Sequence, residues 1–201
     1  MTFGIILLAA GASSRMGEEH KLLLPWGAGT VIGQSVRTAA AVDGAHLVVV
    51  LGCRAAEVRE AAQAALKPCA ADHSPTWAVN PRWQDGMFTS IQTGLAHLPD
   101  TVTAFFVALG DMPMMPAQAY RTLIRAYEEQ PDRIYVPTYE GRRGHPVLVP
   151  RRLVSDTPPP DSDQGLRSVL RQHPNLVVEI PVPYRGICID LDTPDEYRRY
   201  V

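Results

Sequence analysis

Short runs of apolar residues alternate along the chain with longer segments in which apolar positions recur every three or four residues. The short runs, at residues 3–9, 46–51 and 103–109, predict strands buried on both faces of a sheet, because they are too short for helices. Weaker extended patterns occur at 77–79 and 134–136. We therefore expect a sheet whose central strands are shielded from water on both sides.

The longer segments predict amphipathic helices at residues 31–42, 54–66, 87–98 and 116–129. Thr30 stands at the N-cap position of the first helix. Strands that alternate with helices in this way predict a mostly parallel sheet covered on both faces, a three-layer α/β/α arrangement of Rossmann-like type. Ligands of such sheets bind beyond the carboxyl ends of the strands.

After residue 136 the pattern is less regular. We expect an extended segment, a proline-rich loop, a helix, two strands and a short last helix, at residues 146–149, 157–162, 164–171, 176–180, 187–191 and from 194. No internal repeat is present, and no linker is long enough to divide the chain. One domain over residues 1–201 is therefore the expectation.

Composition narrows the class of protein. Hydrophobic residues make up 46% of the 201 residues and charged residues 20%, which is ordinary for a globular domain. The formal net charge of −2 supplies no basic field for a nucleic acid backbone, so we expect no nucleic acid partner. Trp26, Trp77 and Trp83 fit either the core or a stacking surface, and the core is the more frequent use of tryptophan.

No targeting or membrane segment is predicted. The apolar residues 1–10 contain no basic residue and run directly into a glycine-containing turn, unlike a signal peptide. No stretch approaches the roughly 20 apolar residues that are needed to cross a bilayer. We expect a cytoplasmic protein with no membrane partner.

The turn after the first strand carries the first candidate chemistry. Residues 8–17, LAAGASSRMG, are rich in small side chains and include Arg15, and Lys21 follows shortly after. Small side chains let backbone N–H groups approach an anion, and the two cations can neutralise a polyphosphate. The spacing matches neither GxxxxGK[ST] nor GxGxxG. A triphosphate loop and an ordinary strand-ending turn are therefore both open at this point.

Acidic residues follow two later strands. Asp111 is the only charge between residues 101 and 119, and its carboxylate can either hold magnesium or hydrogen-bond its own turn. If the chain is extended at its next acidic segment, Asp190 and Asp192 share one face, which suits a metal ion or its waters. The alternative is that Asp192 or Thr193 caps the last helix.

These segments together resemble the molybdenum cofactor nucleotidyltransferase family, within a wider group of nucleoside triphosphate transferases. The resemblance covers most of the chain and includes the motifs GDMP and GHPV in the family's order. The matched positions are 8–17, 21, 23–25, 80, 86–87, 90, 110–113, 144–147 and 190–197. The resemblance implies a three-layer α/β fold of the nucleotide-diphospho-sugar transferase type.

The resemblance also implies a role for each matched residue. The implied catalytic residues are Arg15, Lys21 and Asp111. The implied nucleotide-binding residues are Leu8, Ala9, Ala10, Gly11, Ser13, Arg15, Lys21, Asn80, Ser90 and Asp111. The implied acceptor-binding residues are Gly86, Met87, His145, Pro146 and Asp163, and the implied metal ligands are Asp111, Asp190 and Asp192. For Asn80, Ser90 and His145, a structural role as a cap or turn residue is equally open.

The first loop also indicates the nucleotide. Ala9-Ala10-Gly11 is similar to the form of the loop that is associated with cytosine, so the resemblance implies CTP in preference to GTP. The implied reaction is Mg²⁺-dependent transfer of CMP from CTP to the phosphate of molybdopterin, with release of pyrophosphate. A molybdenum hydroxylase apoenzyme is the implied partner that receives the product.

Three other functions are open. A nucleotidyltransferase of this type could act on another phosphorylated acceptor, such as a sugar or alcohol phosphate. A non-catalytic chaperone could deliver the cofactor to a molybdenum hydroxylase. A nicotinamide oxidoreductase would suit the expected sheet, although the GxGxxG motif is missing.

Overall fold

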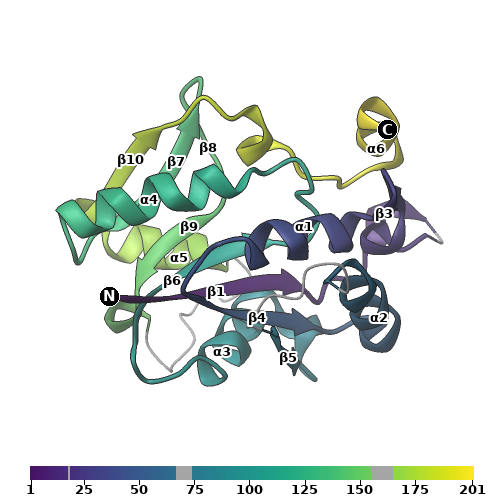
Figure 1. Cartoon of the computed structure of the whole chain (residues 1–201), viewed down its shortest axis with the longest axis horizontal. Helices are drawn as coiled ribbons and strands as arrows, with labels where there is room; N and C mark the ends of the chain where they lie inside the picture. Colours follow the sequence, from purple (N-terminus) through teal and green to yellow (C-terminus); the bar gives the residue numbers. More distant parts are fainter. Residues whose placement is uncertain (18, 67–73, 155–164) are drawn as a thin grey trace.

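One eight-stranded sheet organises the chain. The computed structural model describes residues 1–17, 19–66, 74–154 and 165–201, and every structural statement below concerns these ranges. The strand order is β10-β7-β9-β6-β1-β4-β5, with β8 paired to β7 (Figure 1). The strands are β1 (Thr2–Ala9), β4 (Ala45–Leu51), β5 (Thr76–Val79), β6 (Val102–Leu109), β7 (Ile134–Tyr139), β8 (Arg142–Arg143), β9 (Val147–Pro150) and β10 (Val177–Pro181). The central strands β6, β1, β4 and β5 are parallel, whereas β9 is antiparallel to β6 and to β7.

Helices cover both faces of this sheet. Those on one face are α1 (Val31–Ala40), α2 (Ala55–Leu66) and α4 (Ala117–Glu129), and those on the other are α3 (Met87–Ala96) and α5 (Leu166–Gln172). The last helix, α6 (Pro194–Tyr200), lies near the small hairpin of β2 (Pro25–Trp26) and β3 (Gly29–Thr30) (Figure 1). The Tyr197 hydroxyl donates to the Pro25 carbonyl at 2.6 Å and ties this helix to the hairpin.

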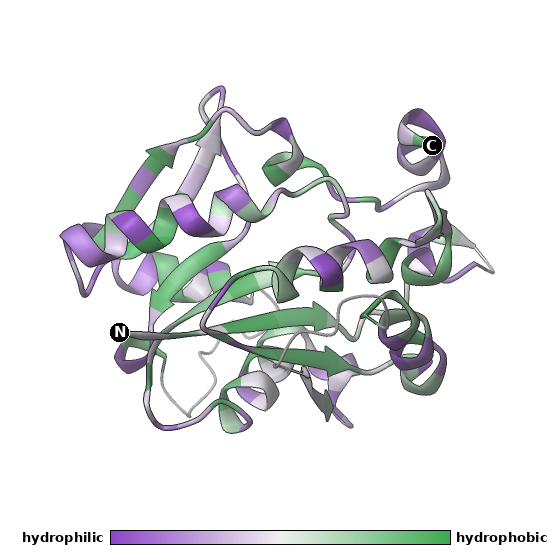
Figure 2. Ribbon diagram, in the orientation of Figure 1, coloured by the Kyte–Doolittle hydropathy of each residue, from purple (hydrophilic) through white to green (hydrophobic). Residues whose placement is uncertain are grey.

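Alternation along the strands divides the core into two layers. Ile5 and Leu7 of β1 pack in the cluster with α1, α2 and α4, while Ile6 between them packs with α3 and α5. Phe106 and Phe105 of β6 are divided in the same way. Because both faces are covered, the central strands are hydrophobic along their length (Figure 2). The predicted three-layer, mostly parallel arrangement is confirmed.

Most predicted elements are confirmed within a few residues. The Thr30 hydroxyl accepts a hydrogen bond from the Gly33 N–H at 3.2 Å, so this residue caps α1 as expected. The helix expected at 164–171 is α5, Leu166–Gln172. The proline-rich loop expected at 157–162 lies outside the described residues.

The strand expected at 187–191 is wrong. A 3₁₀ helix, Arg185–Cys188, occupies the start of this segment, and no strand follows it. The backbone bonds of the segment go to two turns instead of a neighbouring strand, since the Leu191 N–H donates to the Asp111 carbonyl at 3.1 Å and the Ile187 carbonyl accepts from the His145 N–H at 2.9 Å. The apolar residues are buried beneath these turns, which explains a strand-like pattern without a strand.

No helix within the described ranges is both long and apolar enough to cross a membrane. The expected location in the cytoplasm stays a prediction.

Candidate active site

The parallel strands β1, β4 and β6 bring three loops to one edge of the sheet. The loop after β1 lies between the other two, because β1 is hydrogen-bonded to both neighbouring strands. The Ala10 carbonyl accepts from the Cys53 N–H at 3.0 Å, and the Leu8 carbonyl accepts from the Gly110 N–H at 2.9 Å. This is the edge at which ligands of parallel sheets bind.

The loop after β1 holds the start of the Lys21 segment. Ser13 adopts a left-handed conformation with φ of 57°, and its hydroxyl accepts a hydrogen bond from the Lys21 N–H at 3.1 Å. Met16 is buried and anchors the loop to the core. The loop therefore carries Arg15 directly and positions Lys21 through its backbone.

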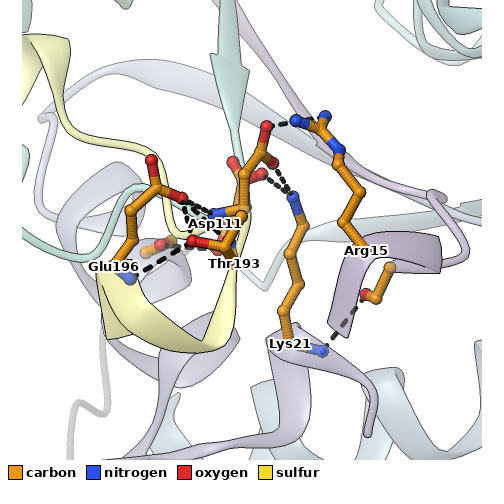
Figure 3. A network of polar contacts seen from close by, with 9 residues as sticks. Arg15, Lys21, Asp111, Thr193 and Glu196 are labelled. Carbon is orange, nitrogen blue, oxygen red and sulfur yellow. Dashed lines mark hydrogen bonds and ion pairs between the residues drawn. The ribbon is translucent and has the colours of Figure 1, made fainter. Parts of the chain in front are cut away.

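Two cations and two carboxylates from three separate segments form an ion cluster (Figure 3). The Lys21 ammonium donates to Asp111 and, at 2.7 Å, to Oδ1 of Asp192. The Arg15 guanidinium contacts Oδ2 of the same Asp192 at 2.7 Å. The cationic turn and two of the three acidic residues singled out in the sequence therefore converge at one point.

The cluster favours the charged forms of Lys21 and Asp192. Burial alone would lower the pKa of Lys21, but the carboxylates of Asp111 and Asp192 outweigh it and raise that pKa. Burial would likewise raise the pKa of Asp192, but Lys21 and Arg15 lower it. At neutral pH the cluster consists of ion pairs.

The cap of the last helix leaves Asp192 free for this cluster. Thr193 caps α6, because its hydroxyl accepts from the Glu196 N–H at 3.2 Å while the Glu196 carboxylate accepts from the Thr193 N–H at 2.9 Å. The same carboxylate accepts the Asp192 N–H at 3.0 Å. Of the two caps left open by the sequence, the structure has Thr193.

Asp190 lies apart from the ion pairs. Among the described residues it has no ion pair, and its exposed side chain lines both cavities of the site. Partial desolvation raises the pKa of Asp190, and the negative charges of Asp192, Asp111 and Glu196 act in the same direction. The shared strand face expected for Asp190 and Asp192 does not exist, because the segment is not a strand.

The residues present fit a divalent cation that arrives together with phosphates. Within the described ranges, no group of three His, Cys, Asp or Glu side chains could hold a metal ion by itself. Asp111 and Asp192 nevertheless both contact one cation, the Lys21 ammonium, so both can reach a common positive charge. Magnesium is commonly held by one or two carboxylates and completed by substrate phosphates and water.

Two adjoining cavities meet at the ion cluster. The first, of about 320 Å³, is lined by the β1 loop, the ion cluster, Trp83 and Ser90. The second, of about 570 Å³, is also lined by Arg15 and includes His145 in its lining. Met87 and Asp190 line both cavities. Two substrates could therefore meet beside the charged residues.

The remaining predicted residues divide between cavity and scaffold. Met87 is exposed and lines both cavities, and Ser90 lines the first, whereas the Asn80 side chain is buried and donates to the hydroxyls of Thr89 and Ser90 at 2.8 and 3.0 Å. Gly86 is the N-cap residue directly before α3 and has φ of 105°. For Asn80 the geometry is that of a residue holding a turn.

His145 lines the second cavity, and its Nδ1 lies 3.2 Å from the Val107 carbonyl oxygen. Burial lowers the pKa of His145, although the bond to Val107 opposes the shift. Pro146 is buried, and Asp163 lies outside the described residues. Sequence reasoning did not single out Arg142 and Arg167, which also line this cavity. The available signal was their position, since Arg142 lies close to the GHPV motif and Arg167 lies four residues after Asp163.

A three-layer α/β fold whose sheet edge combines a glycine loop, two cations and two carboxylates is typical of nucleotidyltransferases. The sequence pattern of the MobA-like NTP transferase domain matches residues 5–177, and the chain belongs to this family.

Two curated relatives match nearly the whole chain. The chain is 30% identical over 193 residues to a molybdenum cofactor cytidylyltransferase from Escherichia coli, covering 96% of this chain and 92% of that protein. It is 33% identical over 207 residues to a nicotine blue oxidoreductase from Paenarthrobacter nicotinovorans, covering 96% and 94%. The family therefore contains proteins named for two classes of reaction.

Solved structures agree with the fold. Rv0371c from Mycobacterium tuberculosis superposes with a TM-score of 0.78 at 27% identity, over 98% of this chain and 96% of that one. A second structure of that protein, a complex with manganese, has a TM-score of 0.75 at 25% identity and covers 99% of this chain and 97% of that one. A structurally similar protein has therefore been solved in complex with manganese.

Proposed function

We propose that this protein transfers CMP from CTP to the phosphate of molybdopterin and releases pyrophosphate. The observation that carries the proposal is the ion cluster of Lys21, Arg15, Asp111 and Asp192 at the meeting point of two cavities. The cytidylyltransferase relative and the Ala9-Ala10-Gly11 form of the loop support CTP and molybdopterin as the substrates.

In the proposed reaction the chain mainly binds and orients the two substrates. A phosphate oxygen of the acceptor forms a bond to the α-phosphorus of CTP, and the bond from that phosphorus to its bridging oxygen breaks. The electron pair of the broken bond leaves with pyrophosphate. A phosphate monoester is already ionised at neutral pH, so positioning and charge neutralisation by Arg15 and Lys21 carry the rate without a general base.

We further propose that Mg²⁺ is the metal and that Asp111 and Asp192 hold it, with Asp190 at the rim. When bound, the ion neutralises charge on the triphosphate. The Lys21 ammonium then exchanges its two carboxylates for the phosphates of the nucleotide. The manganese complex of the mycobacterial protein supports a divalent cation in this fold.

We assign the first cavity to the nucleotide and the second to molybdopterin. His145, Pro146, Gly86, Met87 and Asp163 are the proposed acceptor contacts. Arg142 and Arg167 add positive charge to the lining of the second cavity, which suits an anionic acceptor. A molybdenum hydroxylase apoenzyme is the proposed recipient of the product.

A nucleotide panel tests the first half of this proposal. The melting temperature is measured with CTP, GTP, ATP and UTP, each with Mg²⁺, and CTP is expected to raise it most because only the folded protein binds the nucleotide.

Pyrophosphate release is then measured with CTP and molybdopterin, and with sugar and alcohol phosphates as alternative acceptors. Pyrophosphate release with a sugar phosphate, and none with molybdopterin, would show that the acceptor is a sugar phosphate instead of molybdopterin. A stable complex with a molybdenum hydroxylase and no pyrophosphate release would favour the delivery chaperone.

An oxidoreductase is the second candidate, because a relative of that name is 33% identical over almost the full length. The missing GxGxxG motif and the ion cluster favour the transferase. The melting temperature of the protein with NADH and with NADPH distinguishes the oxidoreductase from the transferase. Stabilisation by a nicotinamide nucleotide and none by CTP would select the oxidoreductase.

A further inference from the structure

The turn between β5 and α3 presents one aromatic side chain to the nucleotide cavity. Trp83 begins the 3₁₀ helix Trp83–Asp85 and lines the cavity of about 320 Å³ together with Ala9, Ala10 and Ser90. Its side chain is half-buried. It is the only aromatic residue in that lining as far as the described residues show.

The three tryptophans differ in their surroundings. Trp26 and Trp77 pack against the hydrophobic core, and the guanidinium carbon of Arg59 lies 5.7 Å from the Trp77 ring centroid. Trp83 belongs to none of the hydrophobic clusters formed by the described residues. The core role that is more frequent for tryptophan therefore does not account for Trp83.

Hydrogen bonds of Asn80 and Thr89 hold the turn between β5 and α3 in place. The Asn80 N–H donates to the Leu51 carbonyl at 2.8 Å, and the Asn80 side-chain oxygen accepts from the Arg82 N–H at 2.9 Å. The hydroxyl of Thr89 donates to the Arg82 carbonyl at 2.9 Å. These bonds hold the backbone immediately before Trp83, and the Asp85 N–H after it donates to the Arg82 carbonyl at 3.0 Å, so the indole is presented by a preorganised turn.

A close approach also fixes Trp83 relative to the β1 loop. A Cβ atom added at Gly52, at the end of β4, would lie 2.6 Å from the Ala10 carbonyl oxygen and 2.8 Å from Cβ of Trp83. Only glycine leaves room for these two groups to meet there. The tryptophan therefore stands directly beside the β1 loop.

The order of the strands separates the charged end of the cavity from the Trp83 end. Asp111 follows β6 on one side of β1, whereas Gly52 and Trp83 are associated with β4 and β5 on the other side. Neighbouring strands lie about 4.8 Å apart, so the two ends are separated by roughly two strand spacings. The cavity of about 320 Å³ spans both ends, so a nucleotide that fills it with its phosphates at the ion cluster would have its base on the β4 side.

We propose that Trp83 is the surface on which the nucleobase stacks, with the turn of residues 80–86 serving to hold it. Stacking on an aromatic ring tolerates any base, because every base has a π face. Trp83 therefore contributes affinity for nucleoside triphosphates in general, and the choice between bases comes from other groups. This inference rests on the nucleotidyltransferase class and does not depend on molybdopterin or on CTP as the preferred nucleotide.

Tryptophan fluorescence and affinity test the inference without any acceptor. CTP with Mg²⁺ is expected to quench the fluorescence of the natural protein, and Trp83→Phe is expected to abolish the quench, whereas Trp77→Phe keeps it. In Trp83→Ala, the Kd for CTP and for GTP is expected to rise by a similar factor of about tenfold or more, the scale of a base–aromatic stack. The Kd for inorganic tripolyphosphate, which has no base, is expected to stay unchanged.

Each contrary outcome overturns the inference in a recognisable way. A quench that persists in Trp83→Phe shows that the base lies elsewhere. Equal affinity for CTP in Trp83→Ala and the natural protein shows that the indole contributes nothing. If Trp83→Ala also loses affinity for tripolyphosphate, the variant has disturbed the β1 loop. The fluorescence quench by CTP in Trp83→Phe then decides whether the base stacks on Trp83. A failure of CMP transfer to molybdopterin would leave all of these results untouched.

Discussion

Lys21 is the residue that connects the three segments of the site. It contacts Asp111 and Asp192, which follow it by 90 and 171 residues, and no local pattern contains that information. The glycine loop and Asp111 could be recognised from the sequence, because each follows a buried strand and could bind a ligand there: the loop a phosphate, and Asp111 a metal ion. The pairing between them follows from the parallel sheet, which places the loops of neighbouring strands at one edge.

The first prediction concerns Asp111. Asp111→Asn is expected to lower pyrophosphate release by about 10²-fold or more, because it removes the charge that faces both Lys21 and the metal, while the fold is retained. Pyrophosphate release and thermal melting are measured on the same preparation. An active variant with unchanged metal dependence would rule out the proposed role of Asp111.

A second prediction concerns Lys21. Lys21→Met is expected to weaken CTP binding, because the ammonium charge meets the triphosphate, and to strengthen Mn²⁺ binding by the nucleotide-free protein, because the two carboxylates lose their cation. Calorimetric titration gives both affinities. Arg37→Met removes a cation from α1, outside the site, and serves as the control. If both variants bind CTP and Mn²⁺ alike, Lys21 has no specific part in the site.

The buried histidines give a prediction of pH dependence. Burial lowers the pKa of His145 and of His20 from the usual value of 6.5. Below that pH the unfolded chain takes up protons that the folded protein resists, so stability is expected to fall between pH 6.5 and 5, by up to about 1.4 kcal/mol per pH unit for each group. The pKa of Asp192 is lowered too, but from 3.8, so its contribution is lost only at more acidic pH.

Denaturant unfolding across this window measures the effect. His145→Gln is expected to flatten the slope, because the replacement does not titrate. An unchanged slope in His145→Gln would contradict the assignment.

Some residues could not be assigned from the sequence. Asn80 was grouped with nucleotide contacts on motif position, yet its side chain bonds within its own turn. For Trp83 the core and a stacking surface were both left open, because residue type alone does not say which tryptophan lies outside the core. In both cases the deciding fact is a contact between segments, which single-residue preferences do not contain.

At the scale of elements, periodicity predicted the strands and helices well where burial is regular. The segment at 187–191 was wrongly predicted as a strand, because burial beneath two turns produces the same apolar pattern as burial in a sheet. The short hairpin of β2 and β3 and the two-residue strand β8 were also not predicted, since two residues show no periodicity. Hydrogen-bond partners, and not hydrophobicity, decide such elements.

The contact between the end of β4 and the Trp83 turn gives a prediction at this scale. Gly52→Ala is expected to destabilise the protein by about 1–3 kcal/mol and to weaken CTP binding, because the new methyl group meets the Ala10 carbonyl and Cβ of Trp83. Gly29→Ala is the matched control, since no atom lies within 4 Å of its added Cβ, and it is expected to change stability by less than about 0.5 kcal/mol. Urea unfolding and CTP titration compare the two. Equal behaviour would show that β4 and the turn are not closely packed.

At the scale of the whole molecule, the sheet explains why residues from both halves of the chain form one site. Its order places β1 between β4 and β6, so the nucleotide loop lies between the Trp83 side and the Asp111 side. The fold class and the site edge were predictable from alternation alone. The identity of the acceptor was not, because the second cavity is built from side chains of β8, α5 and the 3₁₀ helix at Arg185–Cys188 that meet only after folding.

The central claim is that the cationic loop and the carboxylates of Asp111 and Asp192 hold one nucleotide with one divalent cation. Anomalous diffraction from a crystal grown with CTP and Mn²⁺ tests it directly. The account predicts one manganese peak within coordination distance of Asp111, with the Lys21 ammonium moved from the carboxylates to the phosphates. Bound CTP with no peak near Asp111, and Lys21 still between Asp111 and Asp192, would contradict the account.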